Sequence, residues 1–280
     1  MEEVNLGKAD KGHVVLLGDS IFDNAAYVGG GPDVVAQLRQ ELPDWQCSLL
    51  AVDGDVIGGV HRQLGSLPAD ATLLVVSAGG NDALGHAPLL QEKPLSVAEA
   101  LAMLGAAQKT FTRDYSAMID ALAGTGLPSA VCTIYDTPPS EPNHSVIKVA
   151  LCLFNDAITR AAFSRGTALI DLRLICSEDG DYANPIEPSV QGGLKIARAI
   201  ASLARAGRDA GASNHRGGGT AVLTAFQQGR DLGQVSAIGS DETRAAAAQF
   251  LSEVAGSRRA RGAARERKSR RAEPFSARHP

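Results

Sequence analysis

The sequence predicts an α/β fold in which five parallel strands form a central sheet between two layers of helices. Short apolar runs end in Gly, Asp, Ser or Asn, as buried parallel strands do where they enter their carboxyl-end loops. Segments with apolar residues at helical spacing separate these runs. Strands that alternate with helices through short loops build a three-layer α/β/α arrangement with a parallel sheet.

The first predicted strand, residues 14–17, leads directly to Gly18, Asp19 and Ser20. A buried strand that ends in this way brings a hydroxyl group to the edge of the sheet, so Ser20 is the first candidate for a chemical role. Taken alone, Asp19 and Ser20 are better explained as caps of the following turn, because both side chains accept hydrogen bonds from free backbone N–H groups. The choice depends on what the other loops bring to Ser20.

The next segments complete a strand–helix–strand unit. Residues 33–42 carry apolar side chains at helical spacing, and Pro43 ends this predicted helix. A second strand follows at 45–52 and ends in Asp-Gly-Asp, with Gly54 at its centre. A short helix is expected to include residues 61–67.

The clearest strand is residues 72–77, which is followed by small and polar residues at 78–82. A long helix is then predicted at 96–124. Ser96 and Glu99 have the spacing of a capping box, and the apolar residues beyond them form one stripe.

The remaining chain continues the alternation. Strands are predicted at 129–136 and 167–172, with a helix between them at 146–163. A long loop at 176–188 leads to a last helix at 190–206. Because working groups gather outside the carboxyl ends of parallel strands, the loops after the five strands together define the candidate site.

Charge divides the chain into two parts. Residues 1–205 carry 14 Lys and Arg against 24 Asp and Glu, a net charge of −10, whereas residues 206–280 carry 13 against 7, a net charge of +6. We expect an N-terminal segment at 1–12, one α/β domain at 13–205 and a flexible basic tail, rich in Gly, Ala and Arg, at 206–280. Apart from one amphipathic stretch at 241–255, the tail has too few apolar residues to offset the entropy cost of folding.

The composition indicates a globular protein of the cytoplasm. Hydrophobic residues make up 44% of the 280 residues, enough to fill a sizeable core. No run approaches the roughly 20 apolar residues of a membrane span, and the first residues lack the pattern of a secretory signal. The acidic domain argues against nucleic-acid binding and leaves only the basic run at 258–271 as a candidate arm for it. The cysteines form no CxxC pair and are expected to be reduced core thiols: Cys47, Cys132, Cys152 and Cys176.

Three of the predicted loops together resemble the motifs of a known family. Gly18-Asp19-Ser20, Gly54 and Gly80-Asn81-Asp82 follow successive strands in the type and order found in SGNH (GDSL-type) hydrolases, a superfamily of esterases and lipases. The resemblance covers residues 12–205. It implies a flavodoxin-like fold, a small-molecule ester substrate and a nucleophilic Ser20 whose backbone N–H also serves the oxyanion hole, with Gly54 and Asn81 as the other donors.

The requirements of acyl transfer agree with these roles. A developing oxyanion is stabilised by two or three fixed donors close to the nucleophile, and the unobstructed N–H of Gly54 and the amide of Asn81 are donors of this kind. Taken singly, Gly54 could be an ordinary turn glycine and Asn81 a loop residue bonded to its own backbone. Their occurrence together with Ser20 favours the functional interpretation.

The sequence departs from the family pattern in the loop before the last helix. Family members carry an Asp and, three residues later, a His before a proline, and these two residues complete a Ser-His-Asp triad. Here Asn184 stands in place of the Asp and Glu187 in place of the His. Because an Asn cannot stabilise the cation that a histidine base becomes, the usual triad is absent.

Three interpretations of Ser20 remain open. In the first, Glu187 acts as the base directly, which requires burial to raise its pKa from the ordinary ~4.3. In the second, His86 or His144 replaces the missing histidine, because both follow predicted strands at their carboxyl ends. In the third, the domain has lost hydrolysis and keeps a pocket that binds an ester, acyl or sugar ligand.

The leading prediction is a hydrolase that cleaves a carboxylic ester through an acyl-enzyme on Ser20. Gly54 and Asn81 would stabilise the oxyanion, and Glu187 or one of the two histidines would transfer the proton. The alternative is a catalytically inactive binding or scaffold protein on the same fold. No cofactor is expected, and no metal either, although carboxylates cluster at the strand ends and hard cations take oxygen ligands. The sequence makes no prediction of the oligomeric state.

Overall fold

The computed structural model describes residues 12–212, 220–223 and 237–238. The chain divides into two compact units, Met1–Ser236 and Ala237–Pro280. The second unit contributes only the short strand β9 (Ala237–Ile238) to the described residues. The first unit contains all of the predicted site residues and is the one considered below.

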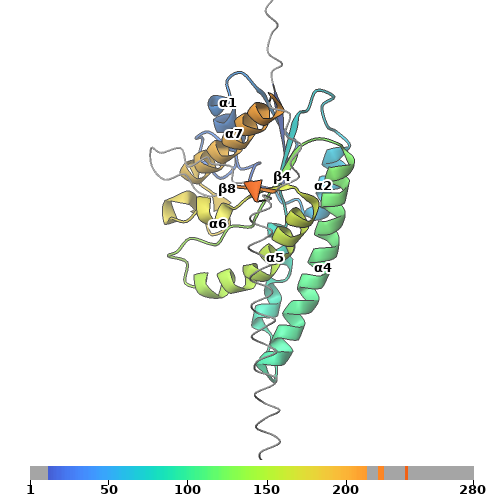
Figure 1. Ribbon diagram of the computed structural model, residues 1–280. Coiled ribbons are helices and arrows are strands. Elements are labelled where there is room, and N and C mark those ends of the chain that lie inside the picture. The colour runs from blue at the N-terminus through green and yellow to red at the C-terminus, as the bar shows by residue number, and fades with distance from the viewer. Residues whose placement is uncertain (1–11, 213–219, 224–236, 239–280) are drawn as a thin grey trace, which may run out of the picture. The chain divides into compact units, whose positions relative to one another are not determined.

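A parallel sheet forms the centre of the first unit (Figure 1). Its spatial order is β2-β1-β3-β4-β5, and every neighbouring pair runs parallel. The predicted α/β/α fold with five parallel strands is therefore confirmed. The strands are β1 (His13–Gly18), β2 (Gln46–Leu49), β3 (Leu73–Ser77), β4 (Ser129–Cys132) and β5 (Ala168–Ile170).

A sixth parallel strand, β8 (Thr220–Leu223), pairs with β5. The sequence does not predict it, because four residues beside a run of glycines carry little pattern. Most of residues 206–280, including the helix expected at 241–255, lies outside the described residues. The division of the chain at residue 205 therefore stays a prediction.

Helices cover both faces of the sheet (Figure 1). On one face α1 (Val34–Glu41) packs against α7 (Val190–Ala212). On the other face lie α2 (Ile57–Leu64), α4 (Val97–Gly124) and α5 (His144–Arg165), with α4 packed against both of the others. The helix predicted at 61–67 thus begins earlier, at Ile57.

The central strand β1 shows why its sequence is apolar throughout. Val14 and Leu16 pack into the cluster that includes α1 and α7, whereas Val15 and Leu17 pack into the cluster that includes α4 and α5. Successive side chains of a strand point to opposite faces, so a strand covered on both sides needs apolar residues at every position. All four of these side chains are fully buried.

Local sequence motifs predict the start of α4 but do not predict several short elements. Ser96 caps α4 by accepting a hydrogen bond from the N–H of Glu99, as the predicted capping box requires, and the Glu99 carboxylate accepts from the N–H of Leu95. Several short elements were not predicted, because tertiary contacts rather than local propensity stabilise them; one of them begins at Leu172, the last residue of the strand predicted at 167–172. They are α3 (Gly80–Gly85), η1 (Ala87–Gln91), α6 (Leu172–Ile175), η2 (Asp179–Asp181), β6 (Tyr182–Asn184) and β7 (Glu187–Pro188).

The cysteines agree in part with the prediction that all four are reduced thiols in the core. All four are free, and Cys47, Cys132 and Cys176 are buried, whereas Cys152 is exposed on α5. Within the described part of the chain, no helix combines the length and the apolar character needed to cross a bilayer.

Candidate active site

Ser20 lies directly after β1, where the chain turns away from the sheet. The residue is buried, and its hydroxyl donates a hydrogen bond of 2.9 Å to Oε1 of Glu187. The bond joins two residues that are 167 positions apart in the chain. The structure thus brings the predicted nucleophile and one of the predicted bases into direct contact.

Gly18 allows the chain to reach this position. Its φ of +118° lies in the region that favours glycine, and a Cβ at this position would approach the carbonyl oxygen of Ser77 to 1.7 Å. The next residue, Asp19, donates its N–H to the same oxygen over 3.0 Å. This close approach of β1 to β3 fixes the direction in which the backbone carries Ser20.

Glu187 is held by a short antiparallel hairpin, the β6–β7 hairpin, in which it pairs with Asn184. Asn184 uses its side-chain oxygen to accept the N–H of Ile186, which stabilises the turn. Pro188 is tied to α1 through Asn24, whose amide donates to the Pro188 carbonyl while its oxygen accepts the N–H of Val34. These backbone anchors, together with burial to 4% exposure, fix the Glu187 carboxylate beside Ser20.

Burial changes the acidity of two carboxyl groups at the site. It raises the pKa of Glu187 from 4.5 to about 7, with a further increase from the negative charge of Asp53, whereas the hydrogen bond from Ser20 opposes the change. Burial also raises the pKa of Asp19 to about 7. The N–H of Ile21 opposes that increase, and the charge of Glu187 adds to it. Both groups therefore titrate near neutral pH.

Asn81 is the second residue of α3, and its amide donates to the carbonyl of Asp55 over 2.8 Å. This bond ties the loop after β3 to the loop that contains Gly54. Gly54 is exposed and has a φ of +77°, which only glycine adopts without strain. Asp82 adds a second tie, because its carboxylate accepts the N–H of Ile57 at the start of α2. The loops of the second and third predicted motifs are thus fixed to each other.

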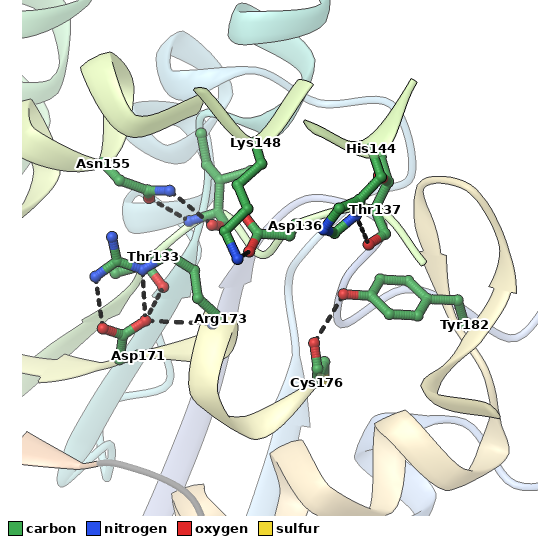
Figure 2. A network of polar contacts seen from close by, with 11 residues as sticks. Thr133, Asp136, Thr137, His144, Lys148, Asn155, Asp171, Arg173, Cys176 and Tyr182 are labelled. Atoms are coloured by element: carbon green, nitrogen blue, oxygen red, sulfur yellow. Dashed lines mark hydrogen bonds and ion pairs between the residues drawn. The ribbon is translucent and has the colours of Figure 1, made fainter. Parts of the chain in front are cut away.

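The two candidate histidines have other contacts. His86 stacks on Phe154 with ring centroids 5.9 Å apart. His144 donates through Nδ1 to the Thr137 carbonyl over 2.9 Å, with the Thr137 hydroxyl 3.2 Å from the same nitrogen (Figure 2). Within residues 12–212, the bond of the Ser20 hydroxyl goes to Glu187 and to neither histidine.

A polar network supports the carboxyl end of β4, next to the site (Figure 2). The Thr133 hydroxyl donates to Asp171, which also forms an ion pair with Arg173. Asn155 bonds both the N–H and the carbonyl of Ile134 over 2.8 Å, and so fastens β4 to α5. These bonds hold the backbone of one wall of the site in place.

Ser20, Asn81 and Glu187 share one cavity of about 640 Å³, whereas Gly54 is not among its lining residues. Most of its wall area is apolar, and α3, η1, α4 and α5 supply part of that apolar wall. The sequence motifs predict none of these apolar residues as part of the site, because helical spacing indicates only that some of them are core residues. The apolar wall residues include Leu84, Leu90, Leu104, Val146, Leu151 and Phe154. Among the described residues, no three His, Cys, Asp or Glu side chains are grouped so as to hold a metal ion.

Known proteins resemble this chain in sequence and in fold. The model of the GDSL-like lipase/acylhydrolase family matches residues 16–192. None of the curated proteins matches this chain.

Three similar solved structures share the fold over about two thirds of this chain. An extracellular lipase from Streptomyces rimosus has 18% identity and a TM-score of 0.51, with 68% of this chain and 99% of that chain covered. The phospholipase A1 from Streptomyces albidoflavus NA297 has 18% identity and a TM-score of 0.54, with coverage of 69% and 99%. The acetyl xylan esterase AlAXEase has 16% identity and a TM-score of 0.52, with coverage of 68% and 98%. At these identities the likeness concerns the fold alone.

Proposed function

We propose that this chain, which belongs to the GDSL-like lipase/acylhydrolase family, hydrolyses a carboxylic ester with Ser20 as the nucleophile and Glu187 as the general base. The observation that carries the proposal is the buried hydrogen bond of 2.9 Å from the Ser20 hydroxyl to Glu187. A nucleophile within hydrogen-bond reach of an anchored base is the arrangement that activates a serine.

The acidity of Glu187 suits this task. A general base works best when its pKa lies near the working pH, and an ordinary carboxylate is too weak a base to meet this condition. Burial raises the pKa of Glu187 to about 7. The ionised form then dominates above neutral pH and is a stronger base than an exposed glutamate.

The reaction proceeds in two halves. The Ser20 oxygen attacks the ester carbonyl carbon while its proton moves to Glu187, and the protonated Glu187 then gives that proton to the alcohol as the carbon–oxygen bond to it breaks. Water attacks the acyl-enzyme in the same way, losing a proton to Glu187, and Ser20 recovers its proton as the acid leaves. Oε2 of Glu187 is buried without a hydrogen-bond partner, so the hydrogen bond from Ser20 to Oε1 is the contact that orients the carboxylate toward the nucleophile.

The oxyanion of each tetrahedral intermediate would be stabilised by the N–H of Ser20 and by the amide of Asn81, two residues that line the cavity, whereas Gly54, the other predicted donor, does not line it. The Asn81 amide has two hydrogens, and one of them is used on the Asp55 carbonyl. That bond orients the amide plane and leaves the second hydrogen for the substrate. Preorganised donors of this kind contribute roughly 3–4 kcal/mol each to transition-state stabilisation.

The character of the cavity favours a substrate with an apolar acyl group over a sugar ligand. Most of its wall area is apolar and includes leucine, valine, isoleucine and phenylalanine side chains, and burial of apolar surface against them contributes roughly 25 cal/mol per Å². Similar structures include a lipase and a phospholipase A1, so the proposed acyl substrates fall within the chemistry known on this fold.

A fluorophosphonate probe with an alkyl chain tests the nucleophile. We expect the probe to label the wild-type chain but not Ser20→Ala. The control Ser66→Ala changes an exposed serine and should be labelled at the wild-type rate. Labelling of Glu187→Gln should be slower by two or more orders of magnitude, on the scale of general-base catalysis. Labelling that persists in Ser20→Ala would exclude Ser20 as the nucleophile.

The missing Asp and His favour one other function, a binding protein without catalytic activity. An inactive protein of this kind would bind a medium-chain fatty acid in calorimetry but would neither react with the probe nor hydrolyse p-nitrophenyl esters. Fatty-acid binding together with probe labelling at Ser20 would reject this alternative.

A further inference from the structure

The start of α4 is exposed although its sequence is apolar. Residues 97–107 contain one charged side chain, Glu99. Leu95 before the helix is 96% exposed, Val97 is 77% exposed and Leu101 is 60% exposed. A helix that is apolar on all sides is normally buried, so this end of α4 indicates a surface that meets something other than water.

Neighbouring elements extend the same surface. α5 packs along α4 (Figure 1), and near its own start it exposes Val149 at 71% together with Val146. Leu84 of α3 and Leu90 of η1 are also about half exposed. We name these seven residues the apolar face: Leu84, Leu90, Leu95, Val97, Leu101, Val146 and Val149.

The apolar face continues into the cavity that contains Ser20. Leu84, Leu90 and Val146 belong to the face and also line the cavity. A folded protein bound over this rim would cover the entrance to the cavity. A lipid surface in the same place would instead deliver an acyl chain along a continuous apolar path to Ser20.

We propose that the apolar face docks on an electrically neutral lipid surface and that the ester substrate enters the cavity directly from it. The direction of substrate entry rests on the proposed function, whereas the docking itself does not. Membrane binding of such faces grows with the apolar area that is inserted. The preference for neutral lipid follows from charge, because residues 1–205, which include the apolar face, carry a net charge of −10, and the whole chain still carries −4 with the +6 of residues 206–280, so an anionic leaflet offers no net attraction.

Flotation with phosphatidylcholine vesicles tests the docking. The full-length chain carries Ser20→Ala, so that hydrolysis cannot alter the vesicles. We expect it to float with the vesicles, and we expect the added changes Leu101→Asp and Val149→Asp to reduce the bound fraction at least tenfold. The matched control Leu174→Asp changes an exposed leucine on α6, outside the apolar face, and should leave binding unchanged.

Three results would overturn the proposal. They are absence of flotation, equal flotation of the Leu101→Asp/Val149→Asp variant, or a stronger requirement for anionic phosphatidylserine than for phosphatidylcholine. A concentration-dependent dimer that only this double variant abolishes, without vesicle binding, would assign the face to a second copy of the chain.

A second measurement separates docking from catalysis. Neither Leu101 nor Val149 lines the cavity, so the double variant on a wild-type Ser20 background should hydrolyse a water-soluble p-nitrophenyl ester at the wild-type rate. Its hydrolysis of esters in vesicles should fall with its binding. If the wild type hydrolyses no soluble ester but Ser20→Ala still floats, the proposed function fails and the docking stands.

Discussion

Replacing Glu187 by Gln should produce two opposite effects, a loss of activity and a gain in stability at alkaline pH. Gln has the shape of Glu but carries no charge and cannot take a proton from Ser20. Activity should therefore fall by a factor of about 10² or more, the scale of general-base catalysis. Stability should rise because the ionised carboxylate is buried at 4% exposure with one oxygen unpartnered.

The size of the stability effect follows from the pKa of Glu187. Folding raises it from 4.5 to about 7, so the folded protein holds this proton more tightly than the unfolded chain does. The stabilisation is fully present below pH 4.5 and is lost as the pH rises through about 7. At about 1.4 kcal/mol for each pKa unit, the loss amounts to about 3 kcal/mol at high pH. The charge of Glu187 also raises the pKa of Asp19, so its removal acts in the same direction.

Urea unfolding at pH 4.5 and pH 8.5 measures this difference. At pH 4.5 the free energy of unfolding of Glu187→Gln should match that of the wild type. At pH 8.5 it should exceed the wild-type value by about 3 kcal/mol, the cost of ionising Glu187 in the folded protein. Glu92→Gln, which neutralises an exposed glutamate, serves as the control and should follow the wild type at both. Hydrolysis followed in a pH-stat should fall only in Glu187→Gln. Equal stability of Glu187→Gln and wild type at pH 8.5, or full activity of Glu187→Gln, would refute the reasoning.

Three further changes test the surroundings of this residue. Asp53→Asn removes a negative charge that raises the pKa of Glu187, so the pH at which activity is half-maximal should fall. If that pH, measured in the pH-stat, does not change, this electrostatic effect is contradicted. In urea unfolding, Gly18→Ala should destabilise the fold by several kcal/mol, because the new Cβ would lie 1.7 Å from a carbonyl oxygen. The control Gly58→Ala places a Cβ in open space within α2 and should stabilise the fold by about 0.5–1 kcal/mol. The double variant Asn184→Asp/Glu187→His restores the residue types of the triad at two positions that pair in the β6–β7 hairpin. This double variant should hydrolyse esters faster than Glu187→His alone, because the aspartate can stabilise the histidine cation.

The strands of the sheet could be predicted because their environment leaves one simple pattern. A strand covered by helices on both faces needs consecutive apolar residues, and residues 14–17 and 73–76 satisfy this need. The element α3 could not be predicted, because its Gly-Asn-Asp start has low helix propensity. Its contacts with a neighbouring loop supply the missing stability, through Asp82 to the N–H of Ile57 and through Asn81 to the carbonyl of Asp55.

The candidate site was predictable in its location and less so in its contacts. Ser20 and Asn81 follow strands, and the carboxyl ends of parallel strands meet at one edge of the sheet, so the sequence indicates that they lie close together. Glu187 comes from a hairpin that no periodicity reveals, and it meets Ser20 across 167 positions of the chain. His86 and His144 were equally plausible from position alone. Their contacts with Phe154 and Thr137 depend on side-chain packing, which a single sequence does not encode locally.

Asn184 and Glu187, which we predict to replace the Asp and the His of the family, fit each other chemically. A histidine base becomes a cation when it takes the serine proton, and a buried aspartate is needed to stabilise that cation. A glutamate base becomes neutral instead, so no third charged group is required, and Asn184 is free to stabilise the turn of the β6–β7 hairpin. Burial makes the ionised form of Glu187 the costly one, so in the proposed reaction proton uptake from Ser20 would relieve that cost at the moment of attack. An Asn with a His would leave a cation without its partner, and an Asp with a Glu would place two carboxylates together. Under the proposed function, the replacement of both residues is therefore the combination that would keep a base beside Ser20.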